Sequence, residues 1–395
     1  MMHYFLTLLQ LLIGYHLILP LLLYIVYRLT NTKHQKQPLP STQPAADFGV
    51  IITAYQYTES LPGVVSALLK QHYSNYLIYV VADNCDTSNL HFNDDRVILL
   101  QPPTVIASNT GSHFYAINHF KRPHSHIVIM DSDNIAEPGL LSALNRYVQA
   151  GYLAIQGLRK AKNKETQIAK LDAARDFYYH FFDGHVLFSI GSSATLSGSG
   201  MTFQTALYRA CLEHLNIQGA GFDKVLQAEI VKRNIRIAFA QDAIVYDEKT
   251  SRGDQLVKQR ARWINTWFRY FSFGFTLIGK GIRNASFNQI MFGLILLRPP
   301  LFIFLALSGI CMMVNLFFSL TGLMIWLAGF ACFFCGFFIA LKESKAERSI
   351  YQALLHAPVF IFYQLLALMH IRRANKLSVA TQHFHHGETP PNEEV

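Results

Sequence analysis

The chain has 395 residues, of which 51% are hydrophobic and only 15% are charged. Its formal net charge is +9, but many lysines and arginines stand beside apolar segments, where attraction to anionic membrane lipids explains the surplus better than nucleic acid does. Five cysteines give no disulfide framework for a cytoplasmic domain. The composition therefore argues against nucleic acid as a partner and indicates a protein that contacts membrane lipids.

Residues 1–28 begin the chain with an apolar stretch that is long enough, at about 1.5 Å per residue, to cross a bilayer as a helix. A cleaved signal peptide is the alternative, but the stretch lacks the positive charges and the small-residue cleavage site of one. Arg28, Lys33 and Lys36 follow, and by the positive-inside rule they place the next domain in the cytoplasm. We therefore expect a transmembrane anchor over residues 1–28 and a linker over residues 29–46.

Short apolar runs alternate with helical stretches in the middle of the chain. The runs are Gly49–Ala54, Leu77–Ala82, Arg96–Leu100, Ile127–Met130 and Ile235–Ala240. This alternation is typical of an α/β domain with a mostly parallel sheet and helices on both faces. Ser60 as N-cap and Pro62 in the first turn predict a helix directly after the first run. We expect a doubly wound α/β domain with a mixed sheet over residues 47–262.

Two carboxylates, Asp131 and Asp133, follow directly after the fourth apolar run. Ligands of open α/β sheets collect beyond the carboxyl ends of such buried strands, and Mg²⁺ prefers carboxylate oxygens that it shares with substrate phosphates. An Asp-rich turn is the alternative reading of this pair. Asp83 ends the second run, where its carboxylate could bind the base or ribose of a nucleotide or belong to a turn.

The C-terminal third of the chain is again apolar. Residues 287–371 contain room for two transmembrane helices before residue 342, followed by a further segment over residues 350–370 that either crosses the membrane or re-enters it. Residues 372–395 form a polar tail. Residues 263–286 are rich in aromatic side chains and suit an amphipathic helix in the membrane interface, with a buried core helix as the alternative.

Five motifs follow one another in an order that resembles family-2 glycosyltransferases. They are Ala54-Tyr55, Asp83, Asp131-Ser-Asp133, Gly221-Phe-Asp223 and Gln259-Arg-Ala-Arg262-Trp263. The resemblance covers about residues 47–270, and the membrane layout is similar to that of the membrane-bound synthases in the family. The Gln-x-x-Arg-Trp element is the most specific of the five, although alone it could be a basic helix face on a membrane surface. The resemblance implies a GT-A-like sheet flanked by transmembrane helices.

The resemblance also implies a role for each matching residue. Asp131 and Asp133 would bind a Mg²⁺ or Mn²⁺ ion, with Asp131 also within reach of the ribose. Further contacts to a nucleotide diphosphate sugar would come from Ala54, Tyr55, Asp83, Gln259 and Arg262. Trp263 would offer a flat apolar face to the acceptor. Asp223 would act as the base that takes the proton of the acceptor hydroxyl in an inverting transfer, with a helix N-cap as the alternative.

The sequence departs from the family pattern at three places. Phe222 stands where an acidic residue usually precedes the base, His113 replaces a lysine, and Tyr55-Gln56-Tyr57 replaces Tyr-Asn-Glu. The last two changes fall around the nucleotide, for which uridine remains the default that the family implies. The segment Gly198–Met201 reads equally well as an acceptor-side loop and as a tight turn.

We therefore expect a membrane-bound glycosyltransferase whose catalytic domain faces the cytoplasm, in a bacterial inner membrane. Its acceptor would be a growing polysaccharide or a lipid. The alternatives are a single transfer to a glycolipid, or a catalytically inactive subunit that binds nucleotide sugar within a synthase complex. The inactive alternative rests on Phe222 and His113, which depart from the family pattern.

Overall fold

The computed structural model describes residues 2–31, 41, 43–217 and 219–370, so that the polar tail over residues 372–395 and most of the expected linker lie outside the described residues. The described chain forms two compact units. The helical unit is made by the described residues from 2 to 31, from 166 to 192 and from 250 to 370, and the sheet unit by those from 41 to 165 and from 193 to 249. The domain boundaries expected from the sequence stay predictions.

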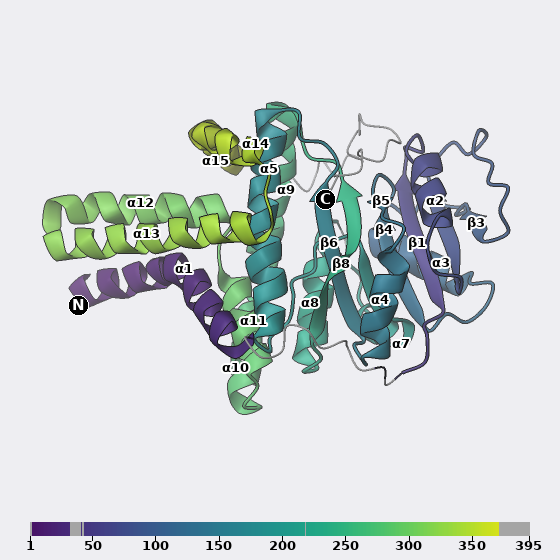
Figure 1. Ribbon diagram of the computed structural model, residues 1–395, viewed down its shortest axis with the longest axis horizontal. Helices are drawn as coiled ribbons and strands as arrows, with labels where there is room; N and C mark the ends of the chain where they lie inside the picture. The colour runs from purple at the N-terminus through teal and green to yellow at the C-terminus, as the bar shows by residue number, and fades with distance from the viewer. Residues whose placement is uncertain (1, 32–40, 42, 218, 371–395) are drawn as a thin grey trace. The chain divides into compact units, whose positions relative to one another are not determined.

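The sheet unit is built on an eight-stranded mixed sheet. Its strands are β1 (Phe48–Tyr55), β2 (Tyr76–Asp83), β3 (Val97–Leu100), β4 (His126–Asp131), β5 (Ile135–Ala136), β6 (Ala154–Ala161), β7 (Met201–Gln204) and β8 (Ile237–Asp247). Their order is β3-β2-β1-β4-β7-β6-β8-β5 (Figure 1). The first four of these run parallel, whereas β7 is antiparallel to both β4 and β6, and β5 is antiparallel to β8. The expected mixed α/β sheet is confirmed.

Strands β1, β2 and β4 are buried along almost their whole length. Their side chains are apolar on both faces, because helices cover a parallel sheet on both sides. The helices of this unit are α2 (Leu61–Leu69), α3 (Asn109–Asn118), α4 (Leu140–Gln149), α7 (Thr205–Leu212) and α8 (Phe222–Lys232). Helix α2 begins at Leu61 with Pro62 in its first turn, as expected, but Ser60 makes no side-chain cap bond, because its backbone is already helical at φ −84° and ψ −17°.

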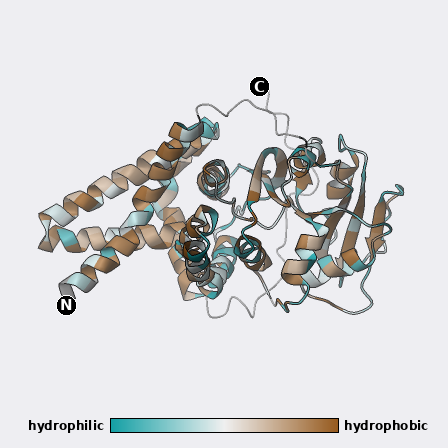
Figure 2. Ribbon diagram, turned by 90° about the horizontal axis from the view of Figure 1, so that it is seen from below, coloured by the Kyte–Doolittle hydropathy of each residue, from teal (hydrophilic) through white to brown (hydrophobic). Residues whose placement is uncertain are grey.

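Among the described residues of the helical unit, all regular secondary structure is helical. They are α1 (Met2–Asn31), α5 (Gln167–Tyr179), the π-helix η1 (His180–Val186), α6 (Leu187–Ser189), α9 (Gly253–Tyr270), α10 (Phe273–Arg283), α11 (Phe287–Leu297), α12 (Leu301–Phe318), α13 (Leu320–Glu343), α14 (Arg348–Ala353), the 3₁₀-helix η2 (Leu354–His356) and α15 (Ala357–Met369). Within the part of the chain that the structure describes, four stretches are long and apolar enough to cross a membrane: Leu6–Thr30, Leu301–Phe318, Leu320–Glu343 and Arg348–Met369. Their hydrophobic colouring is plain along α12 and α13 in Figure 2.

Helices α1, α12 and α13 lie side by side (Figure 1). Gln10 of α1 accepts hydrogen bonds through Oε1 from Nδ2 of Asn315 at 2.7 Å and from Nε1 of Trp326 at 2.9 Å. Gly14 faces the Trp326 ring, and a Cβ there would lie 3.4 Å from it, an ordinary van der Waals contact. Apolar helices in lipid gain little from hydrophobic burial against each other, so small residues and polar contacts of this kind hold them together.

Candidate active site

The carboxyl ends of β2, β1 and β4 bring three of the expected site residues to one edge of the sheet. Asp83 is the register partner of Tyr55, and Asp131 is the partner of Thr53 on the other side of β1. Neighbouring strands lie about 4.8 Å apart, so β1 separates the two aspartates, and Tyr55 lies two residues beyond Thr53 at the end of β1. Ala54 is 2% exposed and directly precedes Tyr55.

Asp83 is already bound to the protein backbone. Its two carboxylate oxygens accept hydrogen bonds from the N–H groups of Ile106 at 2.9 Å and Ala107 at 2.7 Å. Ala107 has a positive φ of 49°, a strained conformation for a residue with a Cβ. Asp83 therefore fixes the loop that leads into α3, and the expected contact of its carboxylate with a nucleotide stays a prediction.

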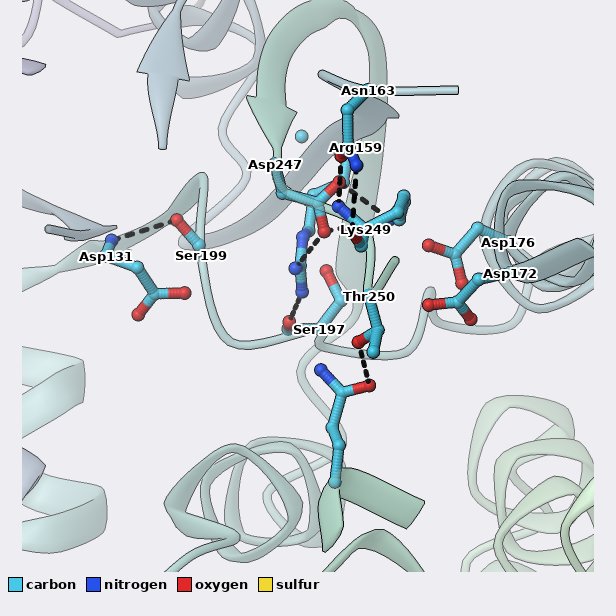
Figure 3. Close-up of polar contacts among 12 residues, drawn as sticks. Asp131, Arg159, Asn163, Asp172, Asp176, Ser197, Ser199, Asp247, Lys249 and Thr250 are labelled. Atoms are coloured by element: carbon cyan, nitrogen blue, oxygen red, sulfur yellow. Dashed lines mark hydrogen bonds and ion pairs between the residues drawn. The ribbon is translucent and has the colours of Figure 1, made fainter. Parts of the chain in front are cut away.

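The carboxylates of Asp131 and Asp133 are half-buried at the end of β4. The backbone N–H of Asp131 donates to Oγ of Ser199 at 3.1 Å (Figure 3). Ser199 lies between two glycines with positive φ, and a Cβ on Gly200 would lie only 2.9 Å from a methyl group of Val245. The Gly198–Met201 segment bends into β7 beside β4, and both sequence readings of it, an acceptor-side loop and a tight turn, stay predictions.

This pair of carboxylates suits a divalent cation that is shared with a substrate. Mg²⁺ and Mn²⁺ favour oxygen ligands, and such ions often take one or two carboxylates and complete their shell with water and phosphate oxygens. Among the described residues, no three histidine, cysteine or acidic side chains come together as a metal site. The two carboxylates therefore suit a cation that also binds a diphosphate better than a cation that is bound by protein ligands alone.

Asp223 lies in the first turn of α8, one residue inside the helix. The N-cap is Gly221, with φ of 103°, so the reading of Asp223 as a helix N-cap is wrong. The Asp223 side chain is 17% exposed, and its Oδ2 lies 3.1 Å from Nζ of Lys224. The position leaves the carboxylate accessible at the start of a helix, where the helix dipole favours negative charge.

Phe222 and His113, the two departures from the family pattern, are in contact with each other. Their ring centroids are 5.2 Å apart in an edge-on arrangement, and Nδ1 of His113 lies 2.7 Å from the hydroxyl of Tyr208. Burial lowers the pKa of His113 to about 3, so this histidine is neutral at physiological pH. An uncharged aromatic contact therefore stands where the family pattern places an acid and a lysine.

A buried cluster of charges joins the ends of β6 and β8 (Figure 3). Arg159 donates to the carboxylate of Asp247 and to the carbonyl of Ser197. Lys249, whose side chain is 3% exposed, places Nζ 2.6 Å from Oδ1 of Asp247, and Asn163 bonds both backbone groups of Lys249 at 2.6 and 2.9 Å. Through these contacts Asp247 and Lys249 anchor the ends of β6 and β8.

The Gln-x-x-Arg-Trp element lies on α9, in the helical unit. Gln259 accepts a hydrogen bond through Oε1 from the hydroxyl of Thr250 at 3.1 Å. Burial lowers the pKa of Arg262 from its ordinary value, and Trp263 is 43% exposed. Because these residues belong to the other unit, their expected meeting with the carboxylates of the sheet stays a prediction.

Trp263 contacts two guanidinium groups, that of Arg260 at a variable position of the same element and that of Arg175 on α5. Cζ of Arg260 lies 4.1 Å and Cζ of Arg175 lies 4.4 Å from the ring centroid. Both arginines bind the carboxylate of Asp172, and Arg260 and Asp172 are 2% and 3% exposed. Burial, together with the neighbouring Arg175, lowers the pKa of Arg260 to about 10, so it stays charged at neutral pH. Guanidinium groups therefore cover part of the ring face expected to meet an acceptor.

The fold is similar to that of solved glycosyltransferases. The mannosyltransferase PcManGT from Pyrobaculum calidifontis, in complex with GDP-Man and Mn²⁺, aligns over 93% of this chain and 99% of its own, with a TM-score of 0.58 and 14% identity. TarS from S. aureus aligns over 83% of this chain and 55% of its own at 13% identity, with a TM-score of 0.42, and its 1–349 form over 83% and 90% at 14% identity, with the same score. At these identities the likeness concerns the fold, and only the first alignment is close enough to support it.

No curated protein matches the sequence. The sequence profile described as "Glycosyltransferase like family 2" matches residues 44–266, which is more than half of the chain. The mixed eight-stranded sheet is the GT-A fold of such enzymes. The chain belongs to glycosyltransferase family 2 and is a glycosyltransferase.

Proposed function

We propose that this enzyme transfers a sugar, with inversion, from a uridine diphosphate sugar to a polysaccharide or lipid acceptor at the cytoplasmic face of a bacterial inner membrane. The observation that carries the proposal is the edge of the sheet at which three neighbouring strands end in Asp83, Tyr55 and Asp131. Ligands of open α/β sheets bind beyond this edge. A half-buried carboxylate pair there suits a diphosphate with its cation.

Inverting transfer requires a stabilised leaving group, a base and an ordered acceptor. Asp131 and Asp133 would hold Mg²⁺ or Mn²⁺, which neutralises charge on the departing diphosphate when it is bound. Gln259 and Arg262 would add hydrogen-bond donors to the same phosphates. These interactions matter most as the bond between the sugar and the diphosphate breaks, because negative charge then grows on the phosphate oxygens.

Asp223 would act as the general base. The acceptor hydroxyl attacks the anomeric carbon from the side opposite the diphosphate, its proton passes to the Asp223 carboxylate, and the diphosphate leaves with the bonding electron pair. One displacement of this kind inverts the anomeric configuration. The position of Asp223, accessible in the first turn of α8, supports this role, and Trp263 would then orient the acceptor.

The proposed donor and acceptor determine which substrates should be tested. Uridine is the default implied by the family, and the GDP-Man bound to PcManGT adds a guanosine sugar to the donors to be tested. The Gln-x-x-Arg-Trp element favours extension of a polysaccharide. The four stretches of the described residues that could cross a membrane are little material for a wide secretion pore, which favours single transfer to a lipid as the second candidate.

The proposal is tested with membranes that contain the protein, Mn²⁺ and radiolabelled UDP-glucose, UDP-N-acetylglucosamine or GDP-mannose. A product that grows in size with time supports chain extension. One discrete lipid-soluble product supports single transfer. Donor binding without any consumption, detected as a higher unfolding temperature of the detergent-solubilised protein, would instead identify an inactive subunit of a synthase complex.

A further inference from the structure

Two side chains of α8 hold both backbone groups of Leu196, in the loop formed by residues 194–200. The N–H of Leu196 donates to Oε1 of Gln227 at 3.0 Å, and its carbonyl accepts from Nζ of Lys224 at 2.9 Å. Lys224 and Gln227 are three residues apart and therefore lie on one face of the helix. Gln227 is 1% exposed. The first two turns of α8 and the 194–200 loop are thus bound together at two points.

The same loop also holds the strand that ends in Asp131. Ser199, which is wholly buried, accepts the backbone N–H of Asp131 through Oγ at 3.1 Å. Within the loop, Gln156 of β6 accepts from the N–H of Ser197 at 2.9 Å and donates to the carbonyl of Ser199 at 3.1 Å. One hydrogen-bonded loop therefore connects the carboxylate strand with the first turn of α8.

Lys224 makes a further contact, because its Nζ also lies 3.1 Å from Oδ2 of Asp223. An ammonium group has three donors, so one Nζ can hold the Leu196 carbonyl and the neighbouring carboxylate together. We propose that Lys224 is a positioning residue that fixes the Asp223 carboxylate relative to the strand end of Asp131. This inference rests on the proposed function, in which Asp223 is the base.

A purely structural role of Lys224 predicts that its loss lowers the unfolding temperature, whereas the positioning role predicts that its loss slows turnover. The Lys224 and Asp223 side chains are 36% and 17% exposed, and partly exposed ion pairs of this kind contribute little to stability. Loss of the ammonium group should therefore leave the unfolding temperature nearly unchanged. A misplaced base, in contrast, slows the chemical step while the donor still binds, because a base that is out of place has no direct contact with the nucleotide.

The test compares Lys224→Met, which keeps the length of the side chain, with Lys224→Arg, which keeps its charge. The matched control is Lys232→Met, in the last turn of the same helix, where Lys232 pairs with Glu229 at 3.1 Å. Activity is measured as release of nucleoside diphosphate from whichever of the three radiolabelled donors wild-type membranes consume. We expect kcat to fall about tenfold in Lys224→Met with the donor KM within about twofold. Lys224→Arg should recover most of the loss, and Lys232→Met should behave as wild type.

The outcomes separate this inference from the proposed function. An unchanged kcat in Lys224→Met, or an equal loss in Lys232→Met, overturns the positioning role while Asp223→Asn still tests the base. A large drop in unfolding temperature with a parallel loss of donor binding assigns Lys224 to the fold and also overturns the role. If wild-type membranes consume no donor, or Asp223→Asn keeps full turnover, the proposed function fails and this inference fails with it.

Discussion

Two regions of the molecule, the interior of the helical unit and the edge of the sheet at the end of β4, use their carboxylates in different ways. In the helical unit, Asp172 binds Arg260 and Asp183 binds Arg298, and every one of these four side chains is at most 5% exposed. At the edge of the sheet, Asp131 and Asp133 are half-buried at the end of a strand. A carboxylate that is desolvated is costly unless a cation neutralises it within the protein. One that keeps access to solvent can exchange water for a ligand.

This difference suggests which acidic residues serve the fold and which serve the chemistry. The buried pairs of the helical unit should be intolerant of single changes, because removal of one partner leaves an uncompensated charge. Asp131 and Asp133 should tolerate substitution structurally and fail functionally. The predictions below test that division, beginning with the largest effect.

Asp223→Asn should reduce turnover by about 10²–10⁴-fold, since an amide cannot accept the acceptor proton as a general base does. The side chain is 17% exposed and nearly isosteric with asparagine, so the unfolding temperature and donor binding should stay close to those of the wild type. Turnover is measured with the donor that wild-type membranes consume, and binding by calorimetric titration. Unchanged turnover would remove Asp223 from the mechanism.

Asp172→Ala should lower the stability of the folded protein. Two arginines bind this carboxylate inside the helical unit, and breaking a buried pair typically costs about 3–5 kcal/mol. We expect a large drop in the unfolding temperature of the detergent-solubilised protein. The control is Asp242→Ala, whose ion pair with Arg146 is about half-exposed on both sides and should matter little. If the two variants unfold alike, the buried carboxylate is not structural.

Asp133→Ala should weaken Mn²⁺-dependent donor binding by on the order of 100-fold, because one of two charged ligands is lost. Stability should change little at this half-buried position. Calorimetric titration of the donor with and without Mn²⁺ measures the effect, and chelation of the ion should bring the wild type to the level of the variant. Asp86→Ala, an exposed carboxylate beyond β2, serves as the control, and equal affinities in the two variants would argue against a metal role.

Much of the sheet and its edge could be predicted from sequence. Strands β1, β2 and β4 are continuous apolar runs, and the residues at their ends follow a known order of motifs. Strand β6 could not be found in this way, because it mixes polar and charged residues with apolar ones, and β5 is only two residues long.

The contacts that hold the site in place were not predictable. Asp172 and Arg260 are 88 positions apart, and Lys224 and Leu196 are 28 apart. Nothing in the local pattern distinguishes Asp172 and Arg175, three residues apart on one helix face, from a solvated surface pair. Likewise, Phe222 and His113 read as two separate departures from the family pattern, although their rings meet in the fold.

The contact between the rings of His113 and Phe222 gives the smallest expected effect, a dependence of stability on pH. Burial lowers the pKa of His113 to about 3 in the folded chain, against about 6.5 when unfolded. Between these values the unfolded state binds a proton that the folded state does not, so stability is lost as the pH falls below 6.5. The loss due to His113 at pH 5, relative to pH 7.5, is about 2 kcal/mol.

His113→Gln should remove that part of the pH dependence, because glutamine does not titrate. The measurement is the unfolding temperature at pH 7.5 and pH 5 for the wild type, His113→Gln and His214→Gln, which replaces an exposed histidine. His113→Gln should lose less stability than the other two on acidification, whatever its stability at pH 7.5. The same loss in all three proteins would mean that folded His113 is protonated at pH 5. The ring contact of Phe222, the residue before Asp223, would then be with a charged imidazolium and not with a neutral ring.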